Sequence, residues 1–322
     1  MSSVIRSLLT STVLSASLLI SACGTDTQPD HFDELAKQGA YSLCINQTAN
    51  AAFIGSIHHG GSFWRINPLD RLYNWNHKSD EFSNILSCSF SPEGNFAATT
   101  DNRTIALWNS KTGENLGLWN APGDIKDINL SRDGQFALLA MTDYTATYFN
   151  IKQGGVQRTL RHEGVVYDAS LNSQSTLAAT ASDDLTARIW DLRTGKEIQR
   201  LMHNNQVRRA QISANGRFVF TSALSEPGRL WDTQSGKMIR EFTINSGFYN
   251  AIRFNTDNTQ LLTGTSAGKI QLWDLKDGVV IKSWQAIPRN TWVSNNVMIE
   301  DVAFTPNSYL AGASNGRLFH LN

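Results

Sequence analysis

The sequence has little proline and no excess of either charge. Seven of its 322 residues are Pro and 23 are Gly, amounts that exclude a collagen-like chain and a disordered Pro/Gly-rich chain. Lys plus Arg and Asp plus Glu each number 28, so the formal net charge is zero. Proteins that bind nucleic acid normally carry a basic excess or a basic stripe, and this sequence has neither. We therefore expect a folded domain with no nucleic-acid partner.

Familiar catalytic motifs are also missing. The sequence has no phosphate-binding Gly loop and no HExxH helix. His58 and His59 are adjacent, but no second cluster of His, Cys or carboxylate residues at ligand spacing accompanies them. Gly264 to Gly268 fits a GxSxG pattern, yet no helix follows it, and an esterase nucleophile needs a strand-to-helix turn. We expect no catalytic residue, no metal and no cofactor, and hence no enzyme activity.

The longest uncharged run lies near the N-terminus. After Arg6, residues 7–22 carry no charge and are rich in Leu, Ile, Val, Ser and Thr. This run has roughly the length of a signal-peptide core and is too short to span a bilayer as a helix. It ends in Ile20-Ser21-Ala22-Cys23-Gly24, which resembles the lipobox of bacterial lipoproteins. In those proteins the Cys is diacylated and becomes the mature N-terminus.

This resemblance implies three segments. Residues 1–22 are a signal peptide, residues 23–30 are the lipidated Cys23 and a polar tether, and residues 31–322 are the folded domain. Gly24 after the Cys favours the outer membrane over retention at the inner membrane. A cleaved secretory peptide beside a chance Cys is the alternative. We expect a protein of the bacterial cell envelope whose N-terminal lipid is its contact with the membrane.

The chain repeats itself with a period of just over 40 residues. Each repeat contains three β-rich runs separated by polar turns, and most repeats end in an aromatic residue followed by Asp or Asn. The third run ends at Trp64, Trp108, Phe149, Trp190, Trp231, Trp273 and Leu321, at steps of 44, 41, 41, 41, 42 and 48 residues. Trp190-Asp191, Trp231-Asp232 and Trp273-Asp274 carry the dipeptide that names the WD-repeat family, which the chain resembles over about residues 31–322.

The family resemblance implies an all-β fold, a seven-bladed WD-repeat β-propeller with four antiparallel strands in each blade. The last repeat stops at Asn322, directly after its third strand, and so lacks an outermost strand. Residues 31–37 precede the first repeat and have no other partner. We expect this N-terminal segment to supply the missing strand and close the ring, because an open ring would expose two blade faces.

The resemblance also implies a buried hydrogen-bonded tetrad in each regular repeat. Only the fourth repeat matches throughout, with His162, Ser182, Asp184 and Trp190. A Ser, a His and an Asp invite comparison with a nucleophile and its base, but the repeat context implies a structural network. In other repeats the position of Asp184 holds Asn102, Ser225 or Ala267. We expect those blades to rely more on apolar packing.

Two further cysteines, Cys44 and Cys88, fall on predicted innermost strands of neighbouring blades. An oxidising periplasm permits a disulfide between them. Their positions differ by one residue in strand register, so we expect the two side chains to point in different directions and to be free thiols.

Residues at the start of the innermost strands are the candidates for binding a partner. Propellers of this family commonly bind through the face that carries the loops from the outermost to the innermost strand and from the second to the third. We expect these side chains to ring the channel mouth on that face: Tyr41, Lys126, Asp127, Tyr167, Asp168, Arg208, Arg209, Asn250, Glu300 and Asp301. Tyr and Arg often dominate interface energetics. A solvated rim with internally paired charges is the alternative.

One long insertion, residues 287–298, precedes the last innermost strand and should emerge on the same face. Its Trp292 is expected either to contact a partner or to fold back over the channel. We expect an envelope-anchored scaffold or assembly factor that binds another protein. An enzymatic or sugar-binding propeller with a site at the channel mouth is one alternative, and a sensor of a small ligand or peptide is another.

Overall fold

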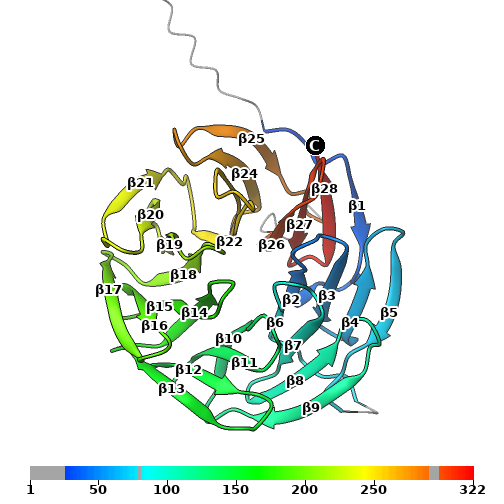
Figure 1. Cartoon of the computed structure of the whole chain (residues 1–322). Helices are drawn as coiled ribbons and strands as arrows, with labels where there is room; N and C mark the ends of the chain where they lie inside the picture. The colour runs from blue at the N-terminus through cyan, green and yellow to red at the C-terminus, as the bar shows by residue number, and fades with distance from the viewer. Residues whose placement is uncertain (1–25, 79–80, 290–296) are drawn as a thin grey trace, which may run out of the picture.

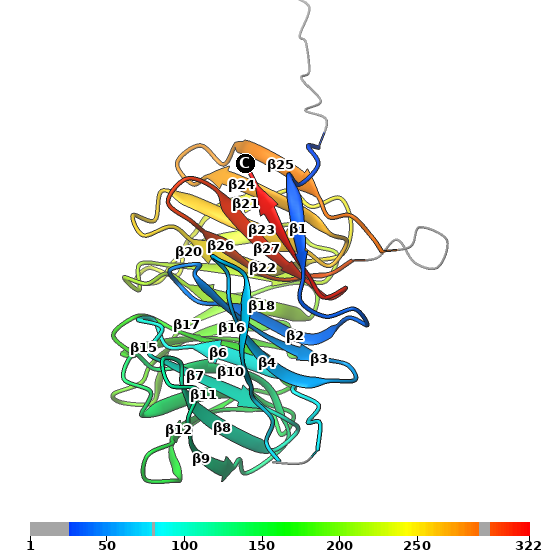
Figure 2. The same ribbon diagram turned by 90° about the vertical axis from the view of Figure 1, so that its right-hand side faces the viewer.

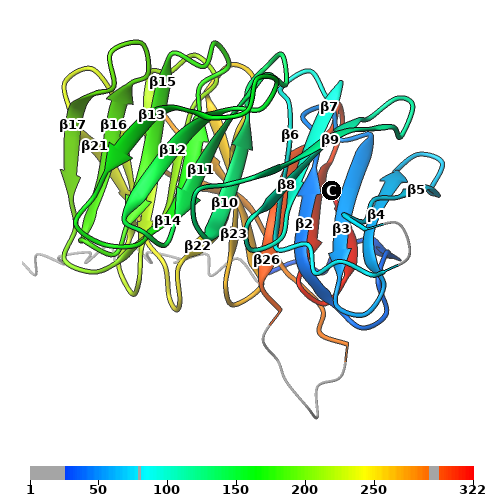
Figure 3. The ribbon, with the colours of Figure 1, turned by 90° about the horizontal axis from the view of Figure 1, so that it is seen from below.

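Seven four-stranded antiparallel sheets surround a central axis in the computed structural model, which describes residues 26–78, 81–289 and 297–322 (Figure 1). Over these residues the chain forms 28 strands. Seen edge-on, the ring is a disc whose strands run between its two faces (Figure 2 and Figure 3). No helix in these ranges is long and apolar enough to cross a membrane. The predicted all-β, seven-bladed propeller is confirmed.

The blades are numbered 1 to 7 along the chain, and each has four strands at increasing distance from the axis. The innermost strands are β2 (Ala40–Ile45), β6 (Ser87–Phe90), β10 (Ile125–Leu130), β14 (Val166–Leu171), β18 (Val207–Ile212), β22 (Tyr249–Phe254) and β26 (Ile299–Phe304). The second strands are β3 (Ala51–Ser56), β7 (Phe96–Thr100), β11 (Phe136–Met141), β15 (Leu177–Ser182), β19 (Phe218–Ala223), β23 (Gln260–Thr265) and β27 (Tyr309–Ala313). The third strands are β4 (Gly60–Arg65), β8 (Thr104–Asn109), β12 (Thr145–Asn150), β16 (Thr186–Asp191), β20 (Gly228–Asp232), β24 (Lys269–Asp274) and β28 (Arg317–Leu321). The outermost strands are β5 (Asp70–Asn74), β9 (Asn115–Asn120), β13 (Val156–Arg161), β17 (Lys196–Met202), β21 (Met238–Phe242), β25 (Val280–Gln285) and β1 (His31–Glu34).

Burial changes from strand to strand with distance from the axis. Neighbouring blades cover both faces of a second strand, so every residue of β3 is buried. An outermost strand has a free edge, and most residues of β17 are exposed. Alternate side chains of each strand point to the two faces of the blade and pack against the preceding and the following blade. The core is therefore a set of apolar layers between blades, as where Leu272, Val302 and Phe319 meet between blades 6 and 7.

The N-terminal strand β1 closes the ring. It pairs antiparallel with β28, with His31 opposite His320 and Glu34 opposite Arg317. The stacked rings of His31 and His320, whose centroids lie 4.0 Å apart, support the pairing. Blade 7 therefore contains strands from both ends of the described propeller. The predicted closing strand is confirmed, although it ends at Glu34.

Cys44 and Cys88 form a disulfide between blades 1 and 2, so the expectation of two free thiols was wrong. The one-residue offset in register is the reason that they meet. Leu43 and Ile45 pack toward blade 7, while Cys44 between them points toward blade 2. Cys88 occupies the register position of Leu43 and therefore points back toward blade 1. Facing sides of neighbouring blades carry side chains from alternate register positions.

Candidate functional site

A channel along the axis of the ring is lined by all seven innermost strands. Its cavity has a volume of about 670 Å³. The charged residues that line it are Lys126, Asp127, Arg132, Asp168, Arg209, Arg253, Glu300 and Asp301. Acidic and basic side chains are equal in number, so the lining has no strong preference for a ligand of one charge when all of them are ionised.

A β-bulge near the start of the innermost strands divides the predicted rim residues into two sets. Strand pairing skips one residue in six blades, and the skipped residues are Tyr41, Lys126, Tyr167, Arg208, Asn250 and Glu300. The pairing of β6 with β7 shows no such shift. A bulge re-aims the side chain of its extra residue. The bulged residues therefore differ in orientation from the residues that directly follow them.

Five of the six bulged residues are at least partly exposed, and Glu300, which lines the channel, is one of them. Tyr41 and Lys126 are exposed, and Tyr167 and Arg208 are partly exposed. The guanidinium carbon of Arg208 lies 3.9 Å from the centroid of the Tyr167 ring. These two residues come from blades 4 and 5 and do not line the channel cavity. Trp292, the remaining aromatic candidate, lies outside the described residues.

Arg209, which follows a bulge, joins three blades inside the channel mouth. Its Nη1 lies 3.3 Å from Oδ1 of Asp168 in blade 4. Its Nε and Nη2 donate to the backbone oxygen and Oδ1 of Asn250 in blade 6, at 2.8 and 2.7 Å. Asp168 also accepts from the backbone N–H of Ala210 at 2.7 Å. All three nitrogens of this guanidinium therefore already have a partner within the protein.

A second ion pair joins blades 6, 7 and 1. Nη2 of Arg253 lies 2.9 Å from Oδ2 of Asp301 and donates to the backbone oxygen of Ile45 at 2.9 Å. Asp301 accepts from the backbone N–H of Ile45 at 2.8 Å. Arg253 was not among the predicted site residues. The signal was available, because Arg253 lies two residues after Ala251, the blade 6 equivalent of Asp168 and Arg209, and alternation places it on the same face of the strand.

Burial shifts the titration of the carboxyl groups in the channel mouth. Burial, together with repulsion from Asp168, raises the pKa of Asp127 to about 7, although Ser87 donates to its Oδ1 at 2.9 Å. Burial likewise raises the pKa of Glu300 to about 7, against the attraction of Arg209. The pKa of Asp168 is also raised by burial and partly restored by Arg209. The charge of the mouth therefore changes near neutral pH.

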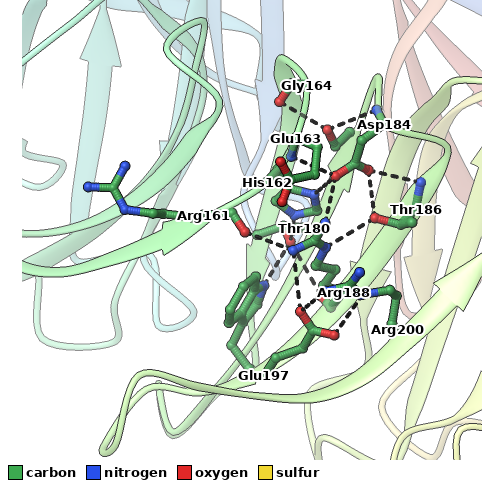
Figure 4. Close-up of polar contacts among 12 residues, drawn as sticks. Arg161, His162, Glu163, Gly164, Thr180, Asp184, Thr186, Arg188, Glu197 and Arg200 are labelled. Atoms are coloured by element: carbon green, nitrogen blue, oxygen red, sulfur yellow. Dashed lines mark hydrogen bonds and ion pairs between the residues drawn. The ribbon is translucent and has the colours of Figure 1, made fainter.

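The predicted tetrad of blade 4 is present with one different member (Figure 4). Trp190 Nε1 donates to Thr180 Oγ1 at 2.8 Å, and Thr180 lies 2.7 Å from Nε2 of His162. Nδ1 of His162 lies 2.9 Å from Asp184 Oδ2. Ser182 stands outside this chain of bonds, since its hydroxyl donates to the backbone oxygen of Gly164. The hydroxyl member is Thr180, because the indole reaches the residue two places before Ser182 on the same face of β15.

Burial also lowers the pKa of His162, although Asp184 opposes that shift. A neutral imidazole fits the geometry, since Nδ1–H donates to Asp184 while Nε2 accepts the Thr180 hydroxyl. Asp184 accepts in addition from the guanidinium of Arg188, a side chain that is itself only 4% exposed. Every member is thus engaged, and no hydroxyl is left as a nucleophile. The arrangement is a structural network.

Blade 5 contains the same network, and blade 2 contains it without a hydrogen bond between His77 Nδ1 and the carboxylate, which corrects the expectation that only blade 4 would match. In blade 5, His203 lies 2.9 Å from Thr221 Oγ1 and 3.2 Å from Glu226 Oε2. In blade 2, His77 lies 3.0 Å from Thr99 Oγ1 and 3.5 Å from Asp101 Oδ2. The Trp residues of the third strands donate to these Thr hydroxyls, as Trp190 does. In blade 5 the carboxylate belongs to Glu226, the residue after Ser225, and in blade 2 it belongs to Asp101, the residue before Asn102. Comparing only the positions aligned with Asp184 therefore missed both carboxylates.

Metal ligands are not gathered in the described part of the chain, where no group of three or more His, Cys, Asp or Glu residues is placed to hold an ion. His58 and His59 lie in the turn between β3 and β4, and neither lines the channel.

Comparison with protein families gives three matches. The family model described as WD domain, G-beta repeat, matches residues 72–109, 154–191 and 236–274. Each match begins at an outermost strand and continues through the inner three strands of the following blade, as in β13 to β16. A sequence repeat therefore spans two blades, which is also how β1 comes to complete blade 7. No curated protein matches the chain.

Proposed function

The chain carries WD40 repeats in a seven-bladed β-propeller, and we propose that it binds a protein partner through the face on which the bulged residues emerge. WD40 propellers commonly bind proteins. The Tyr167–Arg208 pair is the observation that carries this proposal. The pair is partly exposed, does not line the channel and takes no part in the tetrads. Tyr and Arg are enriched among the residues that dominate interface energies. The proposed role is a scaffold or assembly factor without enzyme activity.

We further propose that the chain is a lipoprotein of the bacterial cell envelope, anchored through Cys23 at the outer membrane. The lipobox-like sequence before Cys23 supports this, although Cys23 lies outside the described residues. The Cys44–Cys88 disulfide supports export, because disulfides persist in oxidising compartments such as the periplasm. Mass spectrometry of the protein from its native host tests the anchor. An acylated N-terminal peptide that begins at Cys23 is expected, and an unmodified one would contradict it.

Site-specific photo-crosslinking in the native host tests the binding face. A photoreactive residue replaces Tyr167 or Arg208 in one set of variants. A second set carries it at Lys196, an exposed residue of the outermost strand β17 in blade 4. Both sets preserve the channel contacts of Arg209 and Asp168, so expression and folding should match.

A discrete protein adduct from positions 167 and 208, absent from position 196, is the expected result. It would also identify the partner. Equal adducts from all three positions would show contact without a defined face. Normal expression with no adduct at positions 167 and 208 would overturn the proposed face.

A ligand site in the channel is the second candidate function. The cavity volume of about 670 Å³ and two carboxyl groups with a pKa of about 7 favour it. Such a site would take a small polar molecule, because the lining combines acids, bases and hydroxyl groups. A stabilising thermal shift with a sugar or peptide library would favour this candidate. The shift should then disappear in Asp127→Asn and persist in Tyr167→Ala.

A further inference from the structure

The first described residues are attached to the outer edge of blade 6. Thr27 forms a parallel bridge with Trp284 of β25, and Figure 1 shows the start of the described chain beside β25. Its N–H donates to the backbone oxygen of Ser283 at 2.9 Å, and its own oxygen accepts from the N–H of Gln285 at 3.3 Å. The hydroxyl of Thr27 makes the third bond of this attachment, because it also donates to the backbone oxygen of Ser283, at 2.8 Å. The predicted tether therefore adds a short strand segment to the edge of β25.

Blade 6 offers a cleft that suits this attachment. Asn245 lies four residues before the start of β22, the place that His162 holds before β14 and His203 before β18. Trp273 still donates to Thr263, but the His and carboxylate of the tetrad are missing. A cleft of about 550 Å³ opens there, lined by Asn245, Gln271, Trp273 and Lys269, among others.

Asp26 occupies the wall of this cleft. Its carboxylate lies 3.3 Å from Nζ of Lys269 and accepts from the hydroxyl of Ser283. The tether thus adds a carboxylate to this cleft, and its partners there are Lys269 and Ser283. Side-chain and backbone contacts together fix where the tether leaves the ring, at the outer edge of blade 6.

We propose that the outer edge of blades 5 and 6 faces a phospholipid bilayer, so that the axis of the ring lies along the membrane plane. The inference rests on the proposed acylation of Cys23. Asp26 lies three residues after Cys23 in the sequence, and an extended chain of that length spans about 10 Å. Acyl chains attached at Cys23 therefore hold the bilayer surface close to this edge, whichever way the intervening residues turn.

The chemistry of this edge suits a membrane surface. Met238 and Ile239 of β21 and Ile281 of β25 are exposed, and Val279 beside them is 60% exposed. Lys237, Lys276 and Lys282 are exposed on the same two outer strands and their turns. Apolar side chains at the headgroup boundary and lysines near anionic lipid both favour contact. In this orientation neither face of the ring is turned toward the bilayer. The face with Tyr167 therefore stays available to a partner.

Depth-dependent fluorescence quenching tests this orientation. The full-length acylated protein is reconstituted in vesicles of phosphatidylethanolamine and phosphatidylglycerol that contain a spin-labelled lipid. A fluorophore is attached at Ile281→Cys in blade 6 or at Leu118→Cys in blade 2, a comparably exposed site across the ring. The native cysteines do not compete, because Cys44 and Cys88 are paired and Cys23 is acylated in the proposed form.

Several-fold stronger quenching at position 281 than at position 118 is expected. Equal quenching, or stronger quenching at 118, would overturn the orientation while flotation with the vesicles still supports the anchor. Failure to float would overturn the anchor itself and with it the orientation. A double variant, Asp26→Lys with Thr27→Pro, serves as the second measurement. It repels Lys269 and removes the N–H that bonds Ser283, so quenching at 281 should fall to the level at 118 while flotation persists. Unchanged quenching would show that the docked tether does not set the orientation.

Discussion

Replacing Asp184 by Ala is expected to destabilise the propeller by about 3 kcal/mol, because a buried guanidinium then loses its closest carboxylate. Asp184 accepts from the backbone N–H of Glu163 at 2.9 Å, from Thr186 at 3.0 and 2.6 Å, and from Arg188 at 2.8 Å, besides its contact with His162. Breaking a buried pair typically costs about 3–5 kcal/mol. The lower figure applies, since Arg188 keeps Glu197 at 3.3 Å.

Asp143 of blade 3 provides the matched control. It makes the same two contacts to the following Thr145, at 3.2 and 2.6 Å, but its blade has no tetrad His and no Arg partner. Asp143→Ala should therefore cost only about 1 kcal/mol, the amount of one exposed turn interaction.

Urea unfolding of the protein at pH 7, followed by tryptophan fluorescence, measures both values. At this pH Asp184 is ionised, because its hydrogen-bond partners outweigh burial and hold the pKa of that carboxyl well below its usual range. A cost near 3 kcal/mol for Asp184→Ala and near 1 kcal/mol for Asp143→Ala is expected, to within about 1 kcal/mol. Equal costs would refute the reasoning, since the tetrad and Arg188 would then add nothing beyond the turn.

The remaining predictions concern pH and the disulfide. Burial lowers the pKa of His162 and His203, so at these two groups the folded protein binds fewer protons than the unfolded chain below about pH 6.5. Their contribution to the free energy of unfolding should therefore fall between pH 7 and pH 5, and urea titrations at both pH values should show a smaller fall for a His162→Gln variant than for the unaltered protein. The raised pKa of Asp127 has the opposite sign, because its cost is absent below the unfolded pKa near 4 and grows as pH rises through about 7. Asp127→Asn should thus raise the unfolding free energy at pH 8 and leave it nearly unchanged at pH 4, and equal effects at both pH values would contradict the buried-carboxyl explanation. Replacing Cys44 and Cys88 by Ser should cost about 4 kcal/mol, the chain-entropy value for a loop of 44 residues, and a dithiothreitol-insensitive unfolding midpoint would show that no bond is present in the protein.

The fold was predictable because its signal repeats. The spacing of Trp64, Trp108, Trp190 and their equivalents marks the third strands. Strands β4, β8 and β16 each contain their Trp one residue before the end of the strand. Ring closure followed from counting strands, since a blade without an outermost strand needs one from elsewhere. Both inferences use the chain as a whole and tolerate an error of one or two residues at any strand end.

Single side chains were predicted less well, because a one-residue error changes the face. The choice of Ser182 over Thr180 placed the hydroxyl on the correct face but one step of the alternation too far along β15. Glu226 was missed because it lies one residue after Ser225, the position aligned with Asp184. Its longer side chain nevertheless reaches the imidazole of His203. The register of Cys44 and Cys88 was predicted correctly, and only its consequence for two facing blades was wrong.

The bulge decides which rim residues a partner can use. Residues after the bulge, such as Asp168 and Arg209, exchange hydrogen bonds between blades, and replacing them would leave buried charges unpaired. Loss of binding in an Arg209 variant would therefore report on the ring as much as on an interface. Tyr167 and Arg208 contact each other at the surface, so truncating them removes contact area and leaves the blade-to-blade network intact. The partner-binding hypothesis accordingly narrows from the whole channel mouth to the bulged residues at its surface.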